Sequence, residues 1–271
     1  RVDPGNPKYG ITNTPKVTGG MDVESTQLAA LFYRQAIERV VPVSSPETAE
    51  MVKLLENTFR SVNIALANEM AAICDRLGID VWEVIGAAST KPFGFMPFYP
   101  GPGVGGHCIP LDPIYLAWKM KTLDYQTRFI DLASAINHER PHYVVERTIE
   151  ALRSQGRPIA GADILVLGVA YKPNIDDPRE SPAIDIIEAL ADAGARISYS
   201  DPHVPTIAIG GVVYDSESTT PARLAEADCV LLVTNHRAFD YGCIVRHARL
   251  IVDTRNAFKD APVGAATVIR L

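Results

Sequence analysis

Apolar residues recur at spacings of three and four along one long stretch of the chain, from Pro46 to about Leu77. This spacing places them on one face of an amphipathic helix. Ser45 is suited to cap its start, and Gly78 is a stop signal. Such a helix would be roughly 48 Å long, which is typical of a bridge between domains or of packing against a second copy. The apolar positions are Leu55, Phe59, Val62, Leu66, Met70, Ile73 and Leu77.

The residues before this helix show a strand, helix and strand pattern. Strands are expected at Lys16–Gly19 and Val40–Val43, with a helix from about Ser25 to Arg39 between them. A β-α-β segment of this size is too small to bury a core alone. Residues 1–45 are therefore predicted to be the remnant of an N-terminal Rossmann-type domain, and the opening at Arg1 rather than Met leads us to expect further residues before it.

Helical patterns continue after the long helix as far as Ser154. The pattern predicts a short helix over Asp80–Ala88, another from Pro113 to about Thr122, and a longer one from about Gln126 to Ser154. Pro141 lies inside the last of these and is expected to kink or break it. Residues 46–155 are thus predicted to form a central all-helical domain that dimerises through its long helix.

From Ala160 onward, short apolar strands alternate with helices. Ile164–Gly168 is fully apolar, which is typical of a buried strand in a parallel sheet. The alternation predicts that residues 156–271 form a C-terminal Rossmann-like parallel-sheet domain, which binds ligands at the carboxyl ends of its strands. The fold class is therefore α/β. The remaining expected elements are strands at 196–200, 229–234 and 250–253 and helices at 183–193, 221–226 and 239–247.

Composition narrows the classes of function. A net charge of −6 argues against a nucleic-acid partner, and a mean hydropathy of +0.04 without a long apolar run argues against a membrane span. No signal peptide is recognisable, so a cytoplasmic location is expected. The four cysteines show neither C-x-x-C nor zinc-finger spacing, so no metal site is predicted. Only Cys108 has surroundings that suit chemistry.

Cys108 lies in a glycine-rich segment, Gly101–Pro113. Gly101, Gly103 and Gly106 satisfy the G-x-G-x-x-G spacing of dinucleotide-binding loops. However, no strand-like run precedes them and no uninterrupted helix follows, so we reject that interpretation. Glycines leave the backbone accessible to a ligand. The segment is better interpreted as a glycine cradle that presents one thiol.

Three other groups of residues are candidates for a binding site. Lys53 and Asn57 project from one side of the long helix, although such a pair alone is more typical of a solvated face. The polar loop 170–181 and Arg255 each follow a strand at the same sheet edge, where their cations favour an anion such as a diphosphate. Aromatic residues in the segment 90–100 suit a base or sugar face, or simple packing.

Three separated blocks, with a weaker fourth, resemble one family. They are Ala49–Asn57, Gly101–Pro113 and Leu167–Pro182, followed by Val252–Asn256. Together they resemble the nucleotide-sugar 6-dehydrogenases, which include the UDP-glucose and GDP-mannose dehydrogenases. The resemblance covers essentially the whole chain, with the blocks in the family's order.

The resemblance implies a four-electron, NAD-dependent oxidation of a sugar C6 alcohol to a carboxylate. Cys108 would carry the thiohemiacetal and the thioester, and an aldehyde needs such a nucleophile before it can lose a second hydride. Lys53 and Asn57 would stabilise the oxyanion, and Asp112 would position or activate water. Arg179 would contact NAD. The implied substrate contacts are Lys91, Tyr99, Gly103, Gly105, Gly106, Lys172 and Arg255.

Local sequence favours one branch of this family. The stretch 90–95 and the ending 105–113 resemble enzymes acting on UDP-N-acetylhexosamines, which implies UDP-N-acetylglucosamine or UDP-N-acetylmannosamine as substrate. Glucose-type members often carry Lys where this chain has Leu111, so UDP-glucose 6-dehydrogenase is the alternative. The family's Gly-rich NAD domain and an upstream catalytic Glu are missing from the sequence. We therefore expect the chain as given to be a homodimer that binds UDP without transferring hydride.

Two other classes of function fit parts of the sequence. One is a cysteine hydrolase or transferase that uses Cys108 with His107 as its base. Adjacent residues on an extended loop point apart, however, and the spacing supplies no third group to orient the base. The other is a non-catalytic module that binds UDP and dimerises.

Overall fold

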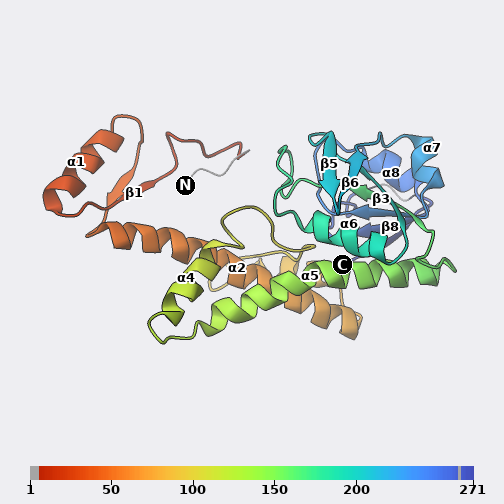
Figure 1. The fold of residues 1–271 in the computed structure, drawn as a ribbon, viewed down its shortest axis with the longest axis horizontal. Coiled ribbons are helices and arrows are strands. Elements are labelled where there is room, and N and C mark those ends of the chain that lie inside the picture. Colours follow the sequence, from red (N-terminus) through yellow and green to blue (C-terminus); the bar gives the residue numbers. More distant parts are fainter. Residues whose placement is uncertain (1–5, 262–263) are drawn as a thin grey trace.

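The computed structural model describes residues 6–261 and 264–271. Figure 1 shows a small β-α-β unit at one end, a layer of long helices in the middle and an α/β domain at the other end. This arrangement confirms the predicted α/β class with a helical centre and a C-terminal parallel sheet. Residues 1–5 lie outside the described part.

The β-α-β unit consists of β1 (Lys16–Thr18), α1 (Val23–Tyr33) and β2 (Val40–Pro42), with the two strands parallel. The Asp22 side chain caps α1 by accepting from the backbone N–H of Ser25. The helix ends at Tyr33 rather than near Arg39 as predicted. It ends early because the following residues must turn back to place β2 beside β1.

The central helices are α2 (Pro46–Leu77), α3 (Val81–Ala88), α4 (Asp112–Lys121) and α5 (Arg128–Ser154). α2 has the predicted bounds. Its N-cap is Ser45, and Gly78 ends it with a φ of 68°, a left-handed conformation that glycine adopts without strain. Pro141 was predicted to kink or break its helix, and α5 continues through it without a break.

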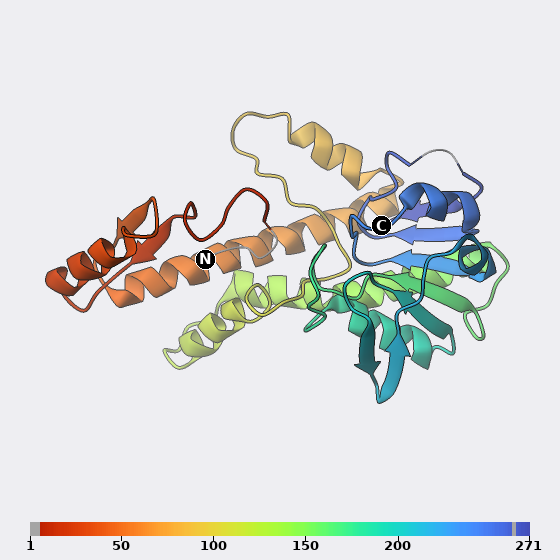
Figure 2. The same cartoon turned by 90° about the horizontal axis from the view of Figure 1, so that it is seen from above.

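The face of α2 that packs inside the chain is not the predicted apolar one. α5 lies along α2 in both views (Figures 1 and 2), and small or polar residues of α2 are the buried ones. Leu55 and Leu66, which the spacing assigns to the apolar face, are 65% and 54% exposed, so the chain's own helices do not cover them. Small side chains allow two helix backbones to approach closely, which explains the choice of face. The buried α2 residues are Asn57, Ser61, Ala65, Ala67, Asn68, Ala71 and Cys74.

The C-terminal domain is built on a five-stranded parallel sheet in the order β4-β3-β7-β8-β9. One apolar cluster, with contributions from α5 and α6, fills one face, and a second, with contributions from α7 and α8, fills the other. α5 thus contributes to the C-terminal core with Val144 and Leu152 while its first half packs on α2. The strands are β3 (Asp163–Leu167), β4 (Arg196–Ser200), β7 (Cys229–Leu232), β8 (Leu250–Asp253) and β9 (Thr267–Arg270). The helices are α6 (Pro182–Asp192), α7 (Pro221–Glu226) and α8 (Tyr241–His247).

Three strands of this domain were missed in the sequence. β5 (Thr206–Ile209) and β6 (Val212–Asp215) form an antiparallel hairpin. Its turn is Gly210–Gly211, both with positive φ, and a Gly-Gly pair between two apolar runs is a recognisable hairpin signal. β9 is a four-residue edge strand. Within the described residues, no helix is long and apolar enough to cross a membrane.

Candidate active site

The glycine-rich segment lies between the central helices and the C-terminal domain, and its first residue is held from two sides. The Gly101 N–H donates to Asn68 Oδ1 at 2.9 Å, and Arg140 Nε donates to the Gly101 carbonyl at 2.8 Å. Both side chains are buried, and Arg140 also lies 4.2 Å over the Tyr143 ring. This pair of contacts to Gly101 was not predicted from the sequence. A signal was present, because Asn57 and Asn68 are eleven residues apart and so share one face of α2.

The glycines of this segment allow protein, rather than only a ligand, to come close. A Cβ at Gly103 would lie 2.8 Å from Pro182, one at Gly105 would lie 2.6 Å from the Glu180 carbonyl, and one at Gly106 would lie 2.8 Å from the Tyr171 ring. Gly106 also has a φ of 82°, which favours glycine. The interpretation of these glycines as an open cradle is therefore wrong for the side that faces the loop 170–182.

Asp112 is the point at which the predicted catalytic residues meet. It starts α4, and its N–H donates to the Cys108 carbonyl at 3.0 Å, so Cys108 lies one turn before it. Asp112 Oδ2 accepts from Lys53 Nζ at 2.7 Å and from Asn57 Nδ2. Lys53 and Asn57 thus both contact Asp112.

The two residues from α2 differ in their freedom to move. The Lys53 side chain is 48% exposed, and it can leave Asp112 without unfolding anything. Asn57 is fully buried, and the Arg60 guanidinium donates to its Oδ1, which orients its NH₂ group towards Asp112. Arg60 was not predicted from the sequence. Cys108 is half-buried.

A second part of the site is a groove of about 730 Å³ between α3 and the loop after β8. It contains two of the predicted substrate contacts, Tyr99 and Arg255, and the Tyr99 ring stacks on Trp82 with centroids 5.8 Å apart. Lys91 and Lys172 are not among the described lining residues. The described lining is Asp80, Trp82, Glu83, Gly86, Tyr99, Pro100, Asn235, Arg255, Asn256, Ala257, Lys259 and Arg270.

Arg255 joins this groove to the glycine-rich segment. Its Nε donates to the Val233 carbonyl at 2.9 Å, and its guanidinium lies so close to Gly101 that a Cβ there would be 2.7 Å from Nη1. Burial lowers the pKa of Arg255 to about 10, although the charge of Asp253 opposes this shift. A side chain with that pKa is still protonated at neutral pH, so the groove ends in a half-buried positive charge.

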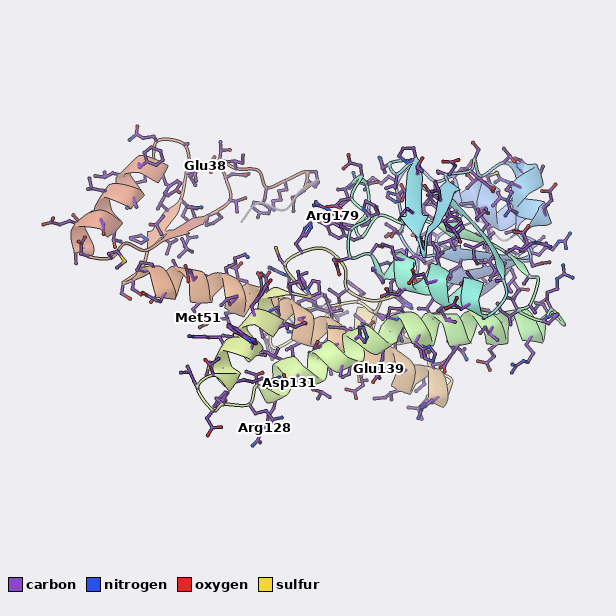
Figure 3. All side chains as sticks on the ribbon, in the orientation of Figure 1. Glu38, Met51, Arg128, Asp131, Glu139 and Arg179 are labelled. Atoms are coloured by element: carbon purple, nitrogen blue, oxygen red, sulfur yellow. The ribbon has the colours of Figure 1, made fainter. Side chains whose placement is uncertain are left out.

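Arg179 stands on the loop after β3, and Figure 3 shows it on the side of the C-terminal domain that faces the N-terminal unit. Its guanidinium binds Asp177 through two hydrogen bonds, of 2.8 and 2.9 Å, which lower the pKa of Asp177. Within the described residues, no hydrogen bond joins His107 to Cys108.

The described residues provide neither a cluster suited to a metal ion nor a loop setting suited to a dinucleotide. No group of three or more His, Cys, Asp or Glu among them is placed to hold a metal ion. Residues 89–100 before the glycine-rich segment contain no strand, and α4 starts only at Asp112. Gly101, Gly103 and Gly106 therefore lack the strand-loop-helix setting of a dinucleotide fingerprint.

Two family models match the sequence. The central domain of the UDP-glucose/GDP-mannose dehydrogenase family matches residues 47–139, and the UDP binding domain of that family matches residues 165–260. The first contains Lys53, Asn57, Cys108 and Asp112, and the second contains the loop after β3 and Arg255.

The similar proteins found are named as dehydrogenases of nucleotide-linked N-acetyl sugars. The UDP-N-acetyl-D-mannosamine dehydrogenase of Methanococcus maripaludis is 35% identical over 264 residues, which cover 94% of this chain and 59% of that protein. The NDP-N-acetyl-D-galactosaminuronic acid dehydrogenase of Ralstonia nicotianae is 35% identical over 270 residues, covering 98% and 61%. The solved UDP-D-ManNAc dehydrogenase of Pyrococcus horikoshii superimposes with a TM-score of 0.86 at 32% identity, covering 100% of this chain and 62% of that one. The chain spans about three fifths of the length of these relatives.

Proposed function

The chain belongs to the UDP-glucose/GDP-mannose dehydrogenase family, and from this we propose that it binds a UDP-sugar and supplies the thiol for the oxidation of C6 to a carboxylate. The observation that carries the proposal is the meeting of Lys53, Asn57 and Asp112 one turn from Cys108. A cation, an amide donor and a carboxylate beside one thiol are the groups that acyl chemistry at that thiol requires.

The nucleotide is proposed to occupy the groove between α3 and the loop after β8. Tyr99 offers an aromatic face to the base or ribose, and Arg255 offers a protonated guanidinium to the diphosphate. Since Arg255 also lies against Gly101, a diphosphate on this side chain would direct the sugar towards the segment that carries Cys108. Lys172 lies on the neighbouring loop and is proposed as a second phosphate contact.

The thiol of Cys108 is proposed to add to the C6 aldehyde, forming a C–S bond and an oxyanion that takes up the thiol proton. Lys53 would move from Asp112 to this oxygen, which its exposed side chain permits, and Asn57 would donate from its fixed position. After oxidation to the thioester, Asp112 would orient water for attack on the carbonyl carbon. The C–S bond then breaks and the thiol is restored.

NAD is the proposed electron acceptor, and it supplies the hydride chemistry when bound. The described residues contain no glycine loop in the setting that a dinucleotide requires, and Arg179, the one predicted NAD contact, is paired with Asp177. We therefore derive no step of the hydride transfer from this chain. Its own residues account for capture of the aldehyde and hydrolysis of the thioester.

The sugar is proposed to be a UDP-N-acetylhexosamine, with UDP-N-acetylmannosamine first. This rests on the names of the relatives from Methanococcus and Pyrococcus and on the segments around residues 90–95 and 105–113. UDP-glucose is the alternative. A comparison of kcat/KM for the two sugars on the catalytically competent protein would decide, and a preference for UDP-glucose would overturn this part of the proposal.

A homodimer through α2 is also proposed. The large apolar side chains on the outer side of this helix are exposed in the single chain, including Leu55, Leu66 and Leu77. A contiguous apolar surface of this kind marks an interface between proteins, and a twofold pairing would cover the same face on both copies.

Calorimetric titration of this chain with UDP and with uridine tests nucleotide binding. We expect UDP to bind and uridine to bind much more weakly, because uridine lacks the diphosphate. Arg255→Gln should remove most of this preference for UDP, whereas Arg157→Gln, an arginine paired with Asp228 away from the groove, should leave it intact. Equal binding of UDP and uridine by the unmodified chain would contradict the proposed orientation.

A further inference from the structure

The loop after β3, residues 170–181, is held in place by buried groups that the proposed mechanism does not use. The loop contains Lys172 and presents the Tyr171 ring to Gly106. Its position therefore decides both where a phosphate contact lies and how the glycine-rich segment is packed. At its base, Thr234 Oγ1 donates to the Ala170 carbonyl at 2.7 Å.

The middle of the loop is attached to the loop after β7 through Asn174. Its backbone N–H donates to His236 Nδ1 at 3.0 Å, and its side-chain Oδ1 accepts from the Arg237 N–H at 2.9 Å. Asn174 has a φ of 62°, a left-handed conformation that asparagine tolerates better than most residues. This attachment lies two residues after Lys172.

The tautomer of His236 follows from these contacts. Because Nδ1 accepts from a backbone N–H, the neutral ring carries its proton on Nε2. Nε2 lies 3.0 Å from Asp201 Oδ2 and donates to it. Both side chains are completely buried, so water cannot replace either partner. A buried donor or acceptor that loses its partner bears the full cost of desolvation.

Asp201 is itself fixed in one orientation. Burial alone would raise its pKa, but hydrogen bonds from His236 and from backbone N–H groups lower the pKa to about 2. It is therefore a carboxylate that only accepts, and it fixes the direction of the His236 ring. The backbone N–H donors to Asp201 are those of Val169 and Ala170 on Oδ2 and of His203 and Val204 on Oδ1.

We propose that His236 is a positioning residue for nucleotide binding. It fixes the 170–181 loop through the Asn174 N–H, and Asp201 holds its ring in the only tautomer that can accept there. His236 touches neither the groove nor Cys108 in the described residues, so its effect on the nucleotide passes through the loop that carries Lys172. The proposal rests on the proposed UDP-binding function, and its test separates the two.

Two substitutions each retain one of the two side-chain hydrogen bonds of His236 and remove the other. In His236→Asn, the amide oxygen can stand near the Nδ1 position and accept from the Asn174 N–H, but the side chain is too short to reach Asp201. In His236→Gln, the amide NH₂ can reach Asp201, but the acceptor for Asn174 is lost. Tyr199→Phe is the control, because it removes another buried hydrogen bond of this domain, from the Tyr199 hydroxyl to the Val204 carbonyl.

The readouts are the dissociation constant for UDP and the amide hydrogen exchange of residues 171–177 without nucleotide. We expect His236→Gln to weaken UDP binding about 10-fold, the scale of one lost hydrogen bond, and to speed exchange at Asn174. His236→Asn should keep both close to the unmodified values even though its melting temperature falls. Tyr199→Phe should lower the melting temperature without changing affinity or exchange.

The result that overturns the proposal is a UDP affinity that follows the melting temperature across all three variants, since His236 would then act only through stability. Unchanged exchange at Asn174 in His236→Gln would overturn it as well. If His236→Gln does not fold, Asn174→Gly tests the same attachment from the half-buried loop: it tolerates the positive φ, loses the bond from Arg237, and should weaken UDP binding about 3-fold. A chain that shows the expected exchange pattern but never binds UDP would instead refute the proposed function.

Discussion

The central helices and the C-terminal domain treat their large apolar side chains in opposite ways. In the described part of the C-terminal domain, the exposed large apolar residues are Val212 and Val213, both on β6. In the central helices, Leu66, Trp118 and Phe129 are 54%, 64% and 78% exposed, and many others accompany them. Met51 of α2, labelled in Figure 3, is another of these exposed side chains.

The two regions differ in whether their apolar side chains are covered within one chain. The C-terminal domain closes both faces of its sheet with its own helices and α5, so its core is complete within one chain. The central helices use small and polar residues against each other and leave the large apolar ones outside. Apolar area of that kind gains stability only when another surface covers it, at about 25 cal/mol per Å². The exposed apolar side chains of the central helices are therefore where we propose that a partner packs, whereas the core of the C-terminal domain needs no partner.

Cys108→Ser should give the largest difference between catalysis and nucleotide binding. In the catalytically competent protein, we expect uronate formation to fall at least about 10⁴-fold, because a hydroxyl is a far weaker nucleophile for capturing the aldehyde. Binding of UDP by calorimetry should remain within about 3-fold of the unmodified value, since Cys108 does not line the proposed nucleotide groove.

Arg255→Gln is the matched variant from the C-terminal domain. Unlike Cys108→Ser, it should lose most of its affinity for UDP. Steady uronate production by Cys108→Ser at a rate near that of the unmodified enzyme would remove the thiol from the mechanism.

Lys53→Ala should have the next largest effect. If Lys53 stabilises the oxyanion, turnover should fall about 10²–10³-fold, the scale for removing one such donor. The effect should appear in kcat rather than in KM, because the interaction forms only as charge develops.

Glu50→Ala, which changes a residue on the exposed side of the same helix, serves as the control and should leave both constants nearly unchanged. A Lys53→Ala defect confined to KM would mean that the lysine binds the ground-state substrate and not the oxyanion.

Association is the third point of comparison. Leu66→Asp places a charge on the apolar face of α2, and we expect it to weaken dimerisation at least about 100-fold, since burying one leucine contributes about 2 kcal/mol and a twofold interface contains it twice. Light scattering over a dilution series would measure this.

Val213→Asp is the control, because it makes the same kind of change on an exposed residue of the C-terminal domain, and it should leave the mass unaltered. A Leu66→Asp protein with the same mass as the unmodified chain at every concentration would show that α2 does not form the interface.

The sequence predicted the helices of both regions and the strands β3, β4, β7 and β8, because helices and strands differ clearly in periodicity. The three- and four-residue spacing of α2 and the apolar run of β3 gave their bounds almost to the residue. The same spacing did not reveal which face of α2 is buried inside the chain. Hydrophobicity marks a face that must be covered, but it does not say by which chain, and small residues such as Ala65 and Ala71 carry little hydrophobic signal.

The sequence predicted the candidate catalytic residues, but it did not predict the buried residues that hold the surrounding segments in place. Lys53, Asn57 and Asp112 were chosen from the sequence, and the structure brings them together. The buried polar residues that position the segments, such as Arg140 and His236, were missed because each has its partner far away in the chain. Only the fold reveals that Arg140 faces Gly101 or that His236 faces Asn174.

The smallest expected effect is on stability, and it belongs to the C-terminal domain. The pKa of Asp201 is about 2 in the folded chain against about 3.9 in an unfolded one, so its charge stabilises the fold by about 2 kcal/mol above pH 4, and this is lost as the pH falls towards 2. We therefore expect Asp201→Asn to lower the free energy of unfolding by about 2 kcal/mol at pH 7, with the difference from the unmodified chain shrinking between pH 4 and pH 2. Urea unfolding across this range would measure it, with Asp177→Asn, at the partly exposed pair with Arg179, as a control expected to change the free energy of unfolding much less. A difference that stays constant down to pH 2 would mean that the charge of Asp201 does not contribute, and that its stabilising role lies only in the shape of its hydrogen bonds.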